Sequence, residues 1–167
     1  TIHRDARGAF ESVAVEMGPA RVEGEQEFEV GRERLRAVRV SMGNPHAVLF
    51  EEASVERAAS VGPAIERMVP GGVNVGFARP RAGGLDLVVW ERGAGLTEAC
   101  GTGACAAVVA AVRTGRIPGG GPVEVRLLVP EGDRLGAGPL EGPQRIGVAV
   151  RAGERDDADV HAAVSNR

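Results

Sequence analysis

The stretch from Thr102 to Arg113, which reads TGACAAVVAAVR, decides the fold. Between its polar ends it carries only Gly, Ala, Cys and Val, so a helix over these residues is apolar on every side. A helix that is apolar all round is buried all round. Gly115 follows shortly after, where helices commonly end. The segment therefore predicts a central helix enclosed by the rest of the chain.

Segments with strand periodicity lie on both sides of this helix in the sequence. Apolar and polar residues alternate in them, or form short apolar runs, and Gly and Pro separate them. The predicted strands are Glu11–Met17, Arg36–Val40, Ala47–Phe50, Leu85–Trp90, Val123–Leu127 and Ile146–Val150. We expect a curved, mainly antiparallel sheet wrapped around the central buried helix, which is an α+β architecture.

A second helix is predicted over Ser54–Met68, with Ser54 as its N-cap. Gly62 and Pro63 lie in its middle, and we expect them to break or restart it. Residues 154–167 are polar and rich in Asp and Arg, and we expect a disordered tail there.

Composition limits the classes of function. The net charge is −3 without a basic patch and aromatic residues make up 3%, so a nucleic-acid partner is not expected. No apolar run approaches the roughly 20 residues of a membrane span, and no secretion signal is apparent. The chain has no Lys, which excludes the internal Schiff base of ordinary pyridoxal phosphate chemistry.

The chain has two cysteines, Cys100 and Cys105, five residues apart. On one helix that spacing turns them to different sides, so a disulfide between them is not expected, and we expect a cytoplasmic location. The three histidines are widely separated and show no metal-ligand pattern, so no metal is expected.

Cys100 lies where a turn leads into the buried helix, within EACGTGAC. The N–H groups at a helix start favour an anion, so we expect a thiol with a lowered pKa. Gly101 and Gly103 let a bound carboxylate approach the backbone, and Thr102 adds a hydroxyl. The alternative is a core cysteine beside a turn; we favour the functional interpretation for Cys100 and the core interpretation for Cys105.

Three polar clusters follow predicted strands or turns: Asn44-Pro45-His46, Asn74, and Glu91-Arg92. Each by itself is typical of a turn or a surface pair. Together with a thiol at a helix start, they could converge on one amino-acid-like ligand.

The segments SMGNPHAV, GGVNVGF and WERGAGLTEACGTGACAA together resemble the diaminopimelate epimerase family, most strongly over residues 42–113. Proline racemase and the phenazine-pathway isomerase are related folds, but are not expected to carry this combination. The resemblance implies two similar halves, each a sheet around a central helix. It also implies interconversion of LL- and meso-diaminopimelate without a cofactor, in which two thiols, one per half, exchange protons on opposite faces of the α-carbon.

The resemblance implies roles for particular residues. Cys100 matches the catalytic thiol of the second half, and His46 and Glu91 match residues that assist it. The matched substrate contacts are Asn44, Asn74, Glu91, Arg92, Gly101 and Thr102.

The resemblance also implies a division of the chain. Residues 1–22 match the strands that connect the halves, and residues 23–153 match the C-terminal-type domain, with a closing strand within Gly142–Gly153 and a poor match after residue 136. The first half and its cysteine have no counterpart, and Cys105 cannot replace that cysteine because it belongs to the helix of Cys100. Two-base epimerisation needs a proton donor on each face, so we expect this chain alone to be inactive or nearly so.

Three interpretations remain open at this stage. The chain is the C-terminal half of an epimerase; or it completes its site by assembly, with a separate first half or a second copy of itself; or it is a binding module for amino acids or carboxylates that lacks turnover.

Overall fold

The computed structural model describes residues 2–4, 6–7, 10–97, 100–128, 144–152 and 157–165 of the chain. These residues form ten strands and two helices. The strands are β1 Ile2–Arg4, β2 Phe10–Val30, β3 Glu33–Ser41, β4 Pro45–Leu49, β5 Asn74–Arg81, β6 Gly84–Glu91, β7 Gly95–Leu96, β8 Pro122–Leu127, β9 Gln144–Ala152 and β10 Asp157–Ser165; the helices are α1 Val55–Met68 and α2 Gly101–Arg113.

The sheet closes on itself into a barrel. The long strand β2 pairs with β10 along its first part and with β3 along its second part, so the order runs β2-β10-β9-β8-β6-β5-β4-β3 and returns to β2. Among the described pairings, only β4–β5 and β6–β8 are parallel. Closure removes the open edges that would otherwise pair with other chains. The predicted curved, mainly antiparallel sheet is confirmed.

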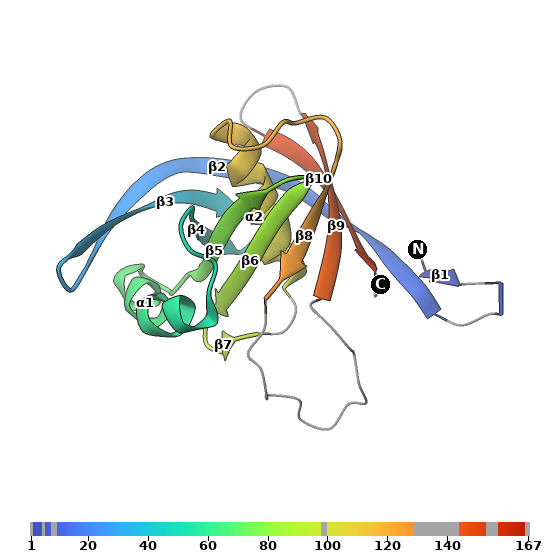
Figure 1. Cartoon of the computed structure of the whole chain (residues 1–167). Helices are drawn as coiled ribbons and strands as arrows, with labels where there is room; N and C mark the ends of the chain where they lie inside the picture. Colours follow the sequence, from blue (N-terminus) through green and yellow to red (C-terminus); the bar gives the residue numbers. More distant parts are fainter. Residues whose placement is uncertain are drawn as a thin grey trace.

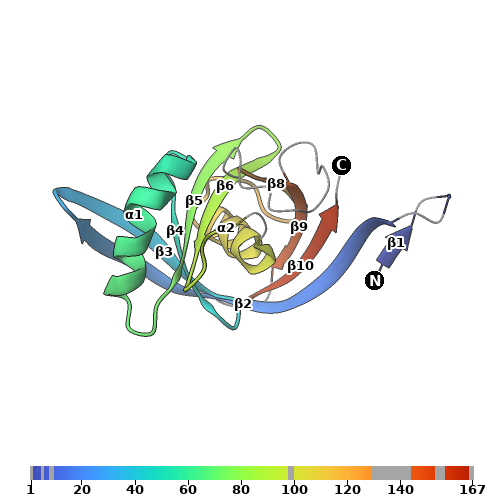
Figure 2. The same cartoon turned by 90° about the horizontal axis from the view of Figure 1, so that it is seen from below.

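The helix α2 fills the barrel, as Figure 2 shows in a view close to the helix axis. It contacts all eight strands of the barrel. Every residue from Gly103 to Ala111 is buried, and from Ala104 onward all but Val109 are fully inaccessible to solvent. Each buried valine stabilises the fold by about 1.5–3 kcal/mol relative to an exposed one. The predicted central helix is therefore confirmed.

The helix α1 lies outside the barrel, against the outer surface of β5 and β6 (Figures 1 and 2). Its buried residues Ala58, Val61 and Ile65 join a second apolar cluster with Phe77 and Val88 of the sheet. The predicted N-cap is confirmed, because the Ser54 side chain accepts a hydrogen bond from the backbone N–H of Arg57.

The predicted break at Gly62-Pro63 is wrong, since α1 runs through both residues. Pro63 removes one helical hydrogen bond, but packing outweighs that cost. Gly62 is needed for the packing, because a Cβ atom there would lie 2.6 Å from Trp90 Cβ. The sequence feature that suggested a helix break is thus a point of close contact between α1 and the barrel.

The prediction of a disordered tail is also corrected, because Asp157–Ser165 forms β10. This strand pairs along its length with β9 on one side and with β2 on the other. Ala158, Val160, Ala162 and Val164 alternate as in a strand, but the polar residues around them suggested a tail. Hydrogen bonding to two neighbouring strands satisfies the backbone groups of this segment. The predicted strand near Ile146–Val150 is confirmed as β9. The predicted division at residue 22 falls inside β2, beside a register shift between Val22 and Gly24.

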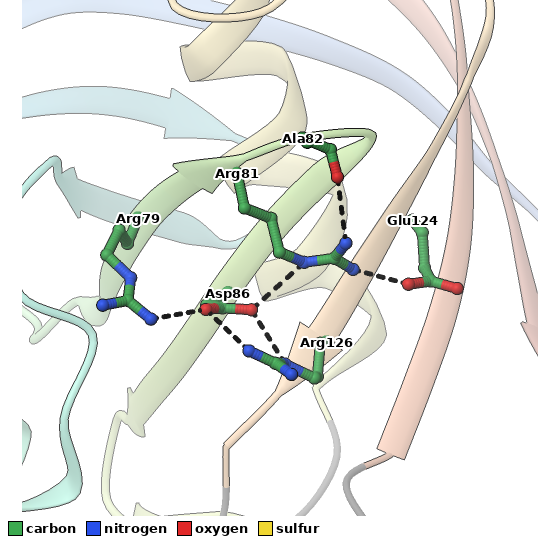
Figure 3. A network of polar contacts seen from close by, with 6 residues as sticks. All are labelled: Arg79, Arg81, Ala82, Asp86, Glu124 and Arg126. Carbon is green, nitrogen blue, oxygen red and sulfur yellow. Dashed lines mark hydrogen bonds and ion pairs between the residues drawn. The ribbon is translucent and has the colours of Figure 1, made fainter.

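An ion-pair network ties three strands together on the outside of the barrel (Figure 3). Asp86 of β6 is 1% exposed and accepts from Arg79 of β5 and, with both oxygens, from Arg126 of β8. Arg81 lies within 3.2 Å of the same carboxylate and also pairs with Glu124. Burial opposes ionisation, but Arg126 and Arg79 together outweigh it and lower the pKa of Asp86. Within the described part of the chain, neither helix is long and apolar enough to cross a membrane.

Candidate active site

The strand ends that carry the predicted site residues meet at one end of the barrel. His46 near the start of β4 pairs with Asn74 at the start of β5, and Val75 pairs with Trp90 near the end of β6. The helix α2 begins at this same end, because a Cβ atom at Gly103 would lie 3.1 Å from Cγ2 of Val89. Residues far apart in the sequence thus gather around the start of the central helix.

Strand alternation turns three of these side chains toward α2. On β4, His46 shares the face of Val48, and on β6, Glu91 shares the face of Val89; both valines belong to the cluster around α2. Asn74 shares the face of Ala78, which belongs to the same cluster. The predicted convergence on one site is therefore supported by strand register as well as by position along the barrel.

Cys100 is the N-cap of α2 and is 6% exposed. Its backbone is extended, with φ −136°, and its Sγ accepts a hydrogen bond from the N–H of Gly103 at 3.3 Å. The hydroxyl of Thr102 lies 3.6 Å from the sulfur. The thiol therefore occupies the position where Ser, Thr or Asp commonly cap a helix, and sulfur takes the role of the capping oxygen.

The pKa of Cys100 differs from the sequence prediction. Burial raises the pKa of the thiol above its ordinary value, and this effect exceeds the opposing hydrogen bonds from Thr102 and Gly103. The carboxylate of Glu91 raises it further by repulsion. The expected lowered pKa is wrong because desolvation of the thiolate outweighs the field of the helix start. In this conformation Cys100 is a protonated thiol at neutral pH.

His46 is 2% exposed, and burial lowers its pKa to about 4. Its Nε2 lies 3.0 Å from Oδ1 of Asn44. A carbonyl oxygen only accepts, so the neutral ring donates through Nε2 and leaves Nδ1 as an acceptor. The Asn44-Pro45-His46 turn therefore fixes the orientation of a neutral imidazole.

Asn74 links the three predicted polar clusters. It is 3% exposed, its Nδ2 donates to the carbonyl of Pro45, and its Oδ1 accepts from the backbone N–H of Arg92. The side chain therefore joins the turn before β4 to the turn after β6. These two bonds engage both ends of the amide, so Asn74 has a clear structural role in addition to its predicted substrate contact.

The remaining predicted contacts lie around this group. Gly101 and Thr102 are half-buried in the first turn of α2, and Met17 of β2 lies close to Gly101. Arg92 is exposed; its guanidinium donates to the carbonyl of Gly71 at 3.0 Å and does not reach into the site in this conformation.

Glu66 of α1 is a residue that the sequence analysis missed. Its carboxylate accepts from the indole N–H of Trp90 at 2.7 Å and from the backbone N–H of Gly93 at 2.9 Å. These bonds lower the pKa of Glu66, with the bond from Trp90 contributing most. In the sequence it resembles an ordinary polar residue of an amphipathic helix, and only the three-dimensional contacts reveal it.

Cys105 belongs to the core, as predicted. It is fully buried within α2, and burial raises its pKa to about 12. Both cysteines are free. Among the described residues, no group of three His, Cys, Asp or Glu side chains is arranged to hold a metal ion.

Comparison with known proteins identifies relatives of this arrangement. The family profile described as diaminopimelate epimerase matches residues 38–135. The diaminopimelate epimerase of Stutzerimonas stutzeri (strain A1501) is 43% identical over 166 residues, which covers 85% of this chain and 56% of the relative. That of Caulobacter vibrioides (strain NA1000 / CB15N) is 58% identical over 81 residues, covering 46% of this chain and 28% of the relative. The chain thus spans about half the length of the first relative and less of the second.

Solved structures share the fold. A probable proline racemase from Agrobacterium radiobacter K84 has a TM-score of 0.70 at 17% identity, and a hydroxyproline epimerase from Agrobacterium vitis has 0.68 at 15%. Each match covers 96% of this chain and 52% of that structure. At this level of identity the likeness shows the fold alone, and it confirms the predicted α+β architecture.

Proposed function

Because the chain belongs to the diaminopimelate epimerase family, we propose that it carries one half of an amino-acid epimerase site, with diaminopimelate as substrate. Cys100 serves as the proton donor and acceptor on one face of the substrate α-carbon. The observation that carries this proposal is the convergence of three inward-facing polar residues, His46, Asn74 and Glu91, on the start of the helix that Cys100 caps.

The protonation state of Cys100 sets its role in this proposal. A raised pKa keeps the sulfur protonated at neutral pH, so the resting chain presents a proton donor. Removing the α-proton requires the thiolate, and the thiolate fraction grows as the pH rises. We therefore expect proton abstraction by the isolated chain to be slow at neutral pH and faster in alkaline solution.

The start of α2 provides a place for the substrate carboxylate. The N–H groups in the first turn of a helix have no partner within the helix, and the dipole favours an anion there. Gly103 already donates to Cys100, so the N–H groups of Gly101 and Thr102 are the donors proposed for the carboxylate. Negative charge that develops on the carboxylate as the α-proton leaves would be stabilised by the same donors.

Neutral His46 and half-buried Glu91 are proposed to assist the proton transfer, while Asn44, Asn74 and Arg92 are proposed as substrate contacts. For Arg92 this requires the guanidinium to leave the carbonyl of Gly71. A reaction by thiols alone needs no pyridoxal phosphate and no metal, and a chain without Lys suits such a reaction. The two free thiols suit the proposed reducing, cytoplasmic setting.

The second thiol of a two-base reaction has to come from outside these 167 residues. The sequence contains only one other cysteine, Cys105, and it is enclosed in the barrel on the helix of Cys100. Epimerisation inverts the carbon, so a donor is required on the opposite face. A separate first half or a second copy of the chain is the proposed source, and the isolated chain is expected to show little turnover.

A binding module is a second candidate, favoured by one observation: the raised pKa of Cys100 leaves little thiolate at neutral pH. Such a module would hold the carboxylate at the start of α2 without proton transfer.

Calorimetry with diaminopimelate, combined with a coupled assay of LL-diaminopimelate turnover, tests these proposals. The epimerase half predicts binding, turnover far below that of ordinary enzymes, and thiol-dependent exchange of the α-proton in heavy water. Cys100→Ala should abolish that exchange, whereas Cys105→Ala should preserve it. Binding that survives Cys100→Ala, with no exchange in either protein, favours the binding module. No binding by the wild-type chain contradicts both.

A further inference from the structure

The turn that follows β6 begins with Arg92, directly after Glu91 at the end of the strand, and three backbone N–H groups hold it in place. The N–H of Arg92 donates to Oδ1 of Asn74, and the N–H of Ala94 donates to the carbonyl of Glu91. The N–H of Gly93 donates to Oε1 of Glu66 at 2.9 Å. Two of the three bonds thus depend on side chains from other elements, one from β5 and one from α1.

Glu66 binds this region through both carboxylate oxygens. Oε1 accepts from the turn itself, and Oε2 accepts from the indole N–H of Trp90, the residue just before Glu91. One carboxylate therefore binds the chain on both sides of Glu91, at Trp90 before it and at Gly93 after it. An ionised carboxylate is suited to this because it only accepts, and hydrogen bonds to charged acceptors are stronger than neutral ones.

The packing of α1 on the barrel brings Glu66 within reach. Gly62 lies one helical turn before Glu66 on the same side of α1, and it rests on Trp90 so closely that a side chain would collide. At the outer edge of the Trp90 ring, a Cβ atom at Gly95 would lie 3.5 Å from Cη2. Gly62 therefore lies near the base of the Trp90 side chain and Gly95 near its outer ring, while the indole N–H donates to Glu66.

We propose that Glu66 is a positioning residue, whose carboxylate holds Glu91 in place beside Cys100 from the outer side of the barrel. The importance of Glu66 for substrate rests on the proposed function, because Glu66 would orient Glu91 and Arg92, which are the residues proposed to act on the substrate. Glu66 itself lies on the face of the sheet opposite to Cys100 and acts only through the turn.

Substitutions at Glu66 separate geometry from charge. Glu66→Gln keeps the shape, but its amide offers one acceptor oxygen to two N–H donors, so one donor faces an NH₂ group. Glu66→Asp keeps the charge, but it is too short to reach both donors. Glu56→Gln is the matched control, because Glu56 is an exposed glutamate in the first turn of the same helix.

The pH dependence of Cys100 alkylation reports the position of Glu91 without any need for substrate. The Glu91 carboxylate raises the pKa of Cys100 by repulsion. Iodoacetamide labelling of the whole chain, mapped to the Cys100 peptide by mass spectrometry, gives the rate at each pH. Glu91→Gln sets the size of the shift expected when the charge is lost. The fluorescence of Trp90, the only tryptophan, reports loss of the indole hydrogen bond.

We expect Glu66→Gln and Glu66→Asp to move the alkylation profile toward lower pH, by a substantial part of the Glu91→Gln shift, and to change Trp90 emission. Glu56→Gln should match the wild-type chain in both. A wild-type alkylation profile in folded Glu66→Gln or Glu66→Asp overturns the proposal, whether or not stability falls. Failure of the wild-type chain to bind diaminopimelate in calorimetry would contradict the proposed function instead, and it leaves the alkylation result decisive for Glu66.

Discussion

Substitution of Gly103 by Ala should displace the Cys100 thiol. A Cβ atom at Gly103 would lie 3.0 Å from Sγ of Cys100 and 3.1 Å from Cγ2 of Val89, both closer than ordinary van der Waals contact. Val89 is 2% exposed, β-branched and held within the sheet, so it has little freedom to move. Cys100 lies at the open end of the helix, and its side chain is the one we expect to rotate toward solvent.

The net loss of stability follows from two opposing effects. Overpacking of a tight site costs about 1–3 kcal/mol. Replacing Gly by Ala inside a helix stabilises the folded state by about 1 kcal/mol, because Ala has the higher helix propensity. Gly103→Ala should therefore lower the free energy of unfolding by up to about 2 kcal/mol, with a fall of about 2–4 °C in Tm per kcal/mol for a domain of this size.

Gly101→Ala is the matched control for stability and thiol reactivity. It changes the other glycine of the same motif, where a Cβ atom would meet only Cε of Met17 at 3.7 Å. Urea denaturation and the pH profile of Cys100 alkylation are the measurements. Rotation toward solvent relieves the burial that raises the pKa of Cys100, so alkylation in Gly103→Ala should be faster at neutral pH. If the two alanine variants behave alike in both measurements, the packing described around Cys100 is wrong.

Three further predictions concern residues around the site. Asp86→Asn leaves three partly exposed guanidiniums without their shared carboxylate, so urea denaturation at pH 7 should show a free energy of unfolding lower by about 2–3 kcal/mol. Because folding lowers the pKa of Asp86, this difference from the wild-type chain should shrink as the pH falls below about 4. Gly62→Ala should destabilise α1 and alter Trp90 fluorescence because of the 2.6 Å contact, and unchanged emission would contradict that contact. His46 stays neutral down to about pH 4, so its ring proton signals in NMR spectra should not titrate between pH 6 and 8. The unfolded chain takes up a proton at this residue below about pH 6.5, so the free energy of unfolding should fall as the pH drops from about 6.5 toward 4. His46→Gln should lack this dependence on pH.

The central helix and the strands around it were predictable because their signals are local. A helix as apolar as Thr102–Arg113 is stable only when it is buried on all sides. The alternation within Leu85–Trp90 predicts a strand with one face toward the core, whichever strands it pairs with. The convergence of His46, Asn74 and Glu91 followed from the same alternation together with the family motifs.

Barrel closure was not predictable because it depends on pairing between distant parts of the chain. The strand β2 continues far beyond the alternating segment Glu11–Met17, and its two parts pair with β10 and with β3. Ala158, Val160, Ala162 and Val164 alternate within Asp157–Ser165, but the alternation is short and built partly on Ala, and the polar residues around it suggested a tail. Gly62-Pro63 misled for a related reason, because tertiary contact with Trp90 outweighs the local tendency to end a helix.

In the candidate site, the position of Cys100 was predicted correctly and its pKa was not. The sequence shows the helix start, whose field lowers a thiol pKa, but it does not show that the thiol is 6% exposed. Burial is a property of the assembled barrel, and here it is the larger effect. Glu66 was missed because its two partners, Trp90 and Gly93, lie more than 20 residues away in the chain.

The most direct test of a one-sided thiol site is hydrogen exchange at the α-carbons of LL- and of meso-diaminopimelate, each tried separately in heavy water. Proton NMR measures loss of the α-proton signal, and chiral chromatography measures conversion to the meso form. A one-sided site predicts slow deuterium incorporation at the reacting carbon of one epimer only. The incorporation should rise with pH, require Cys100, survive Cys105→Ala, and proceed without interconversion of the two forms. Conversion to the meso form at a rate similar to exchange, or exchange that persists in Cys100→Ala, would contradict it.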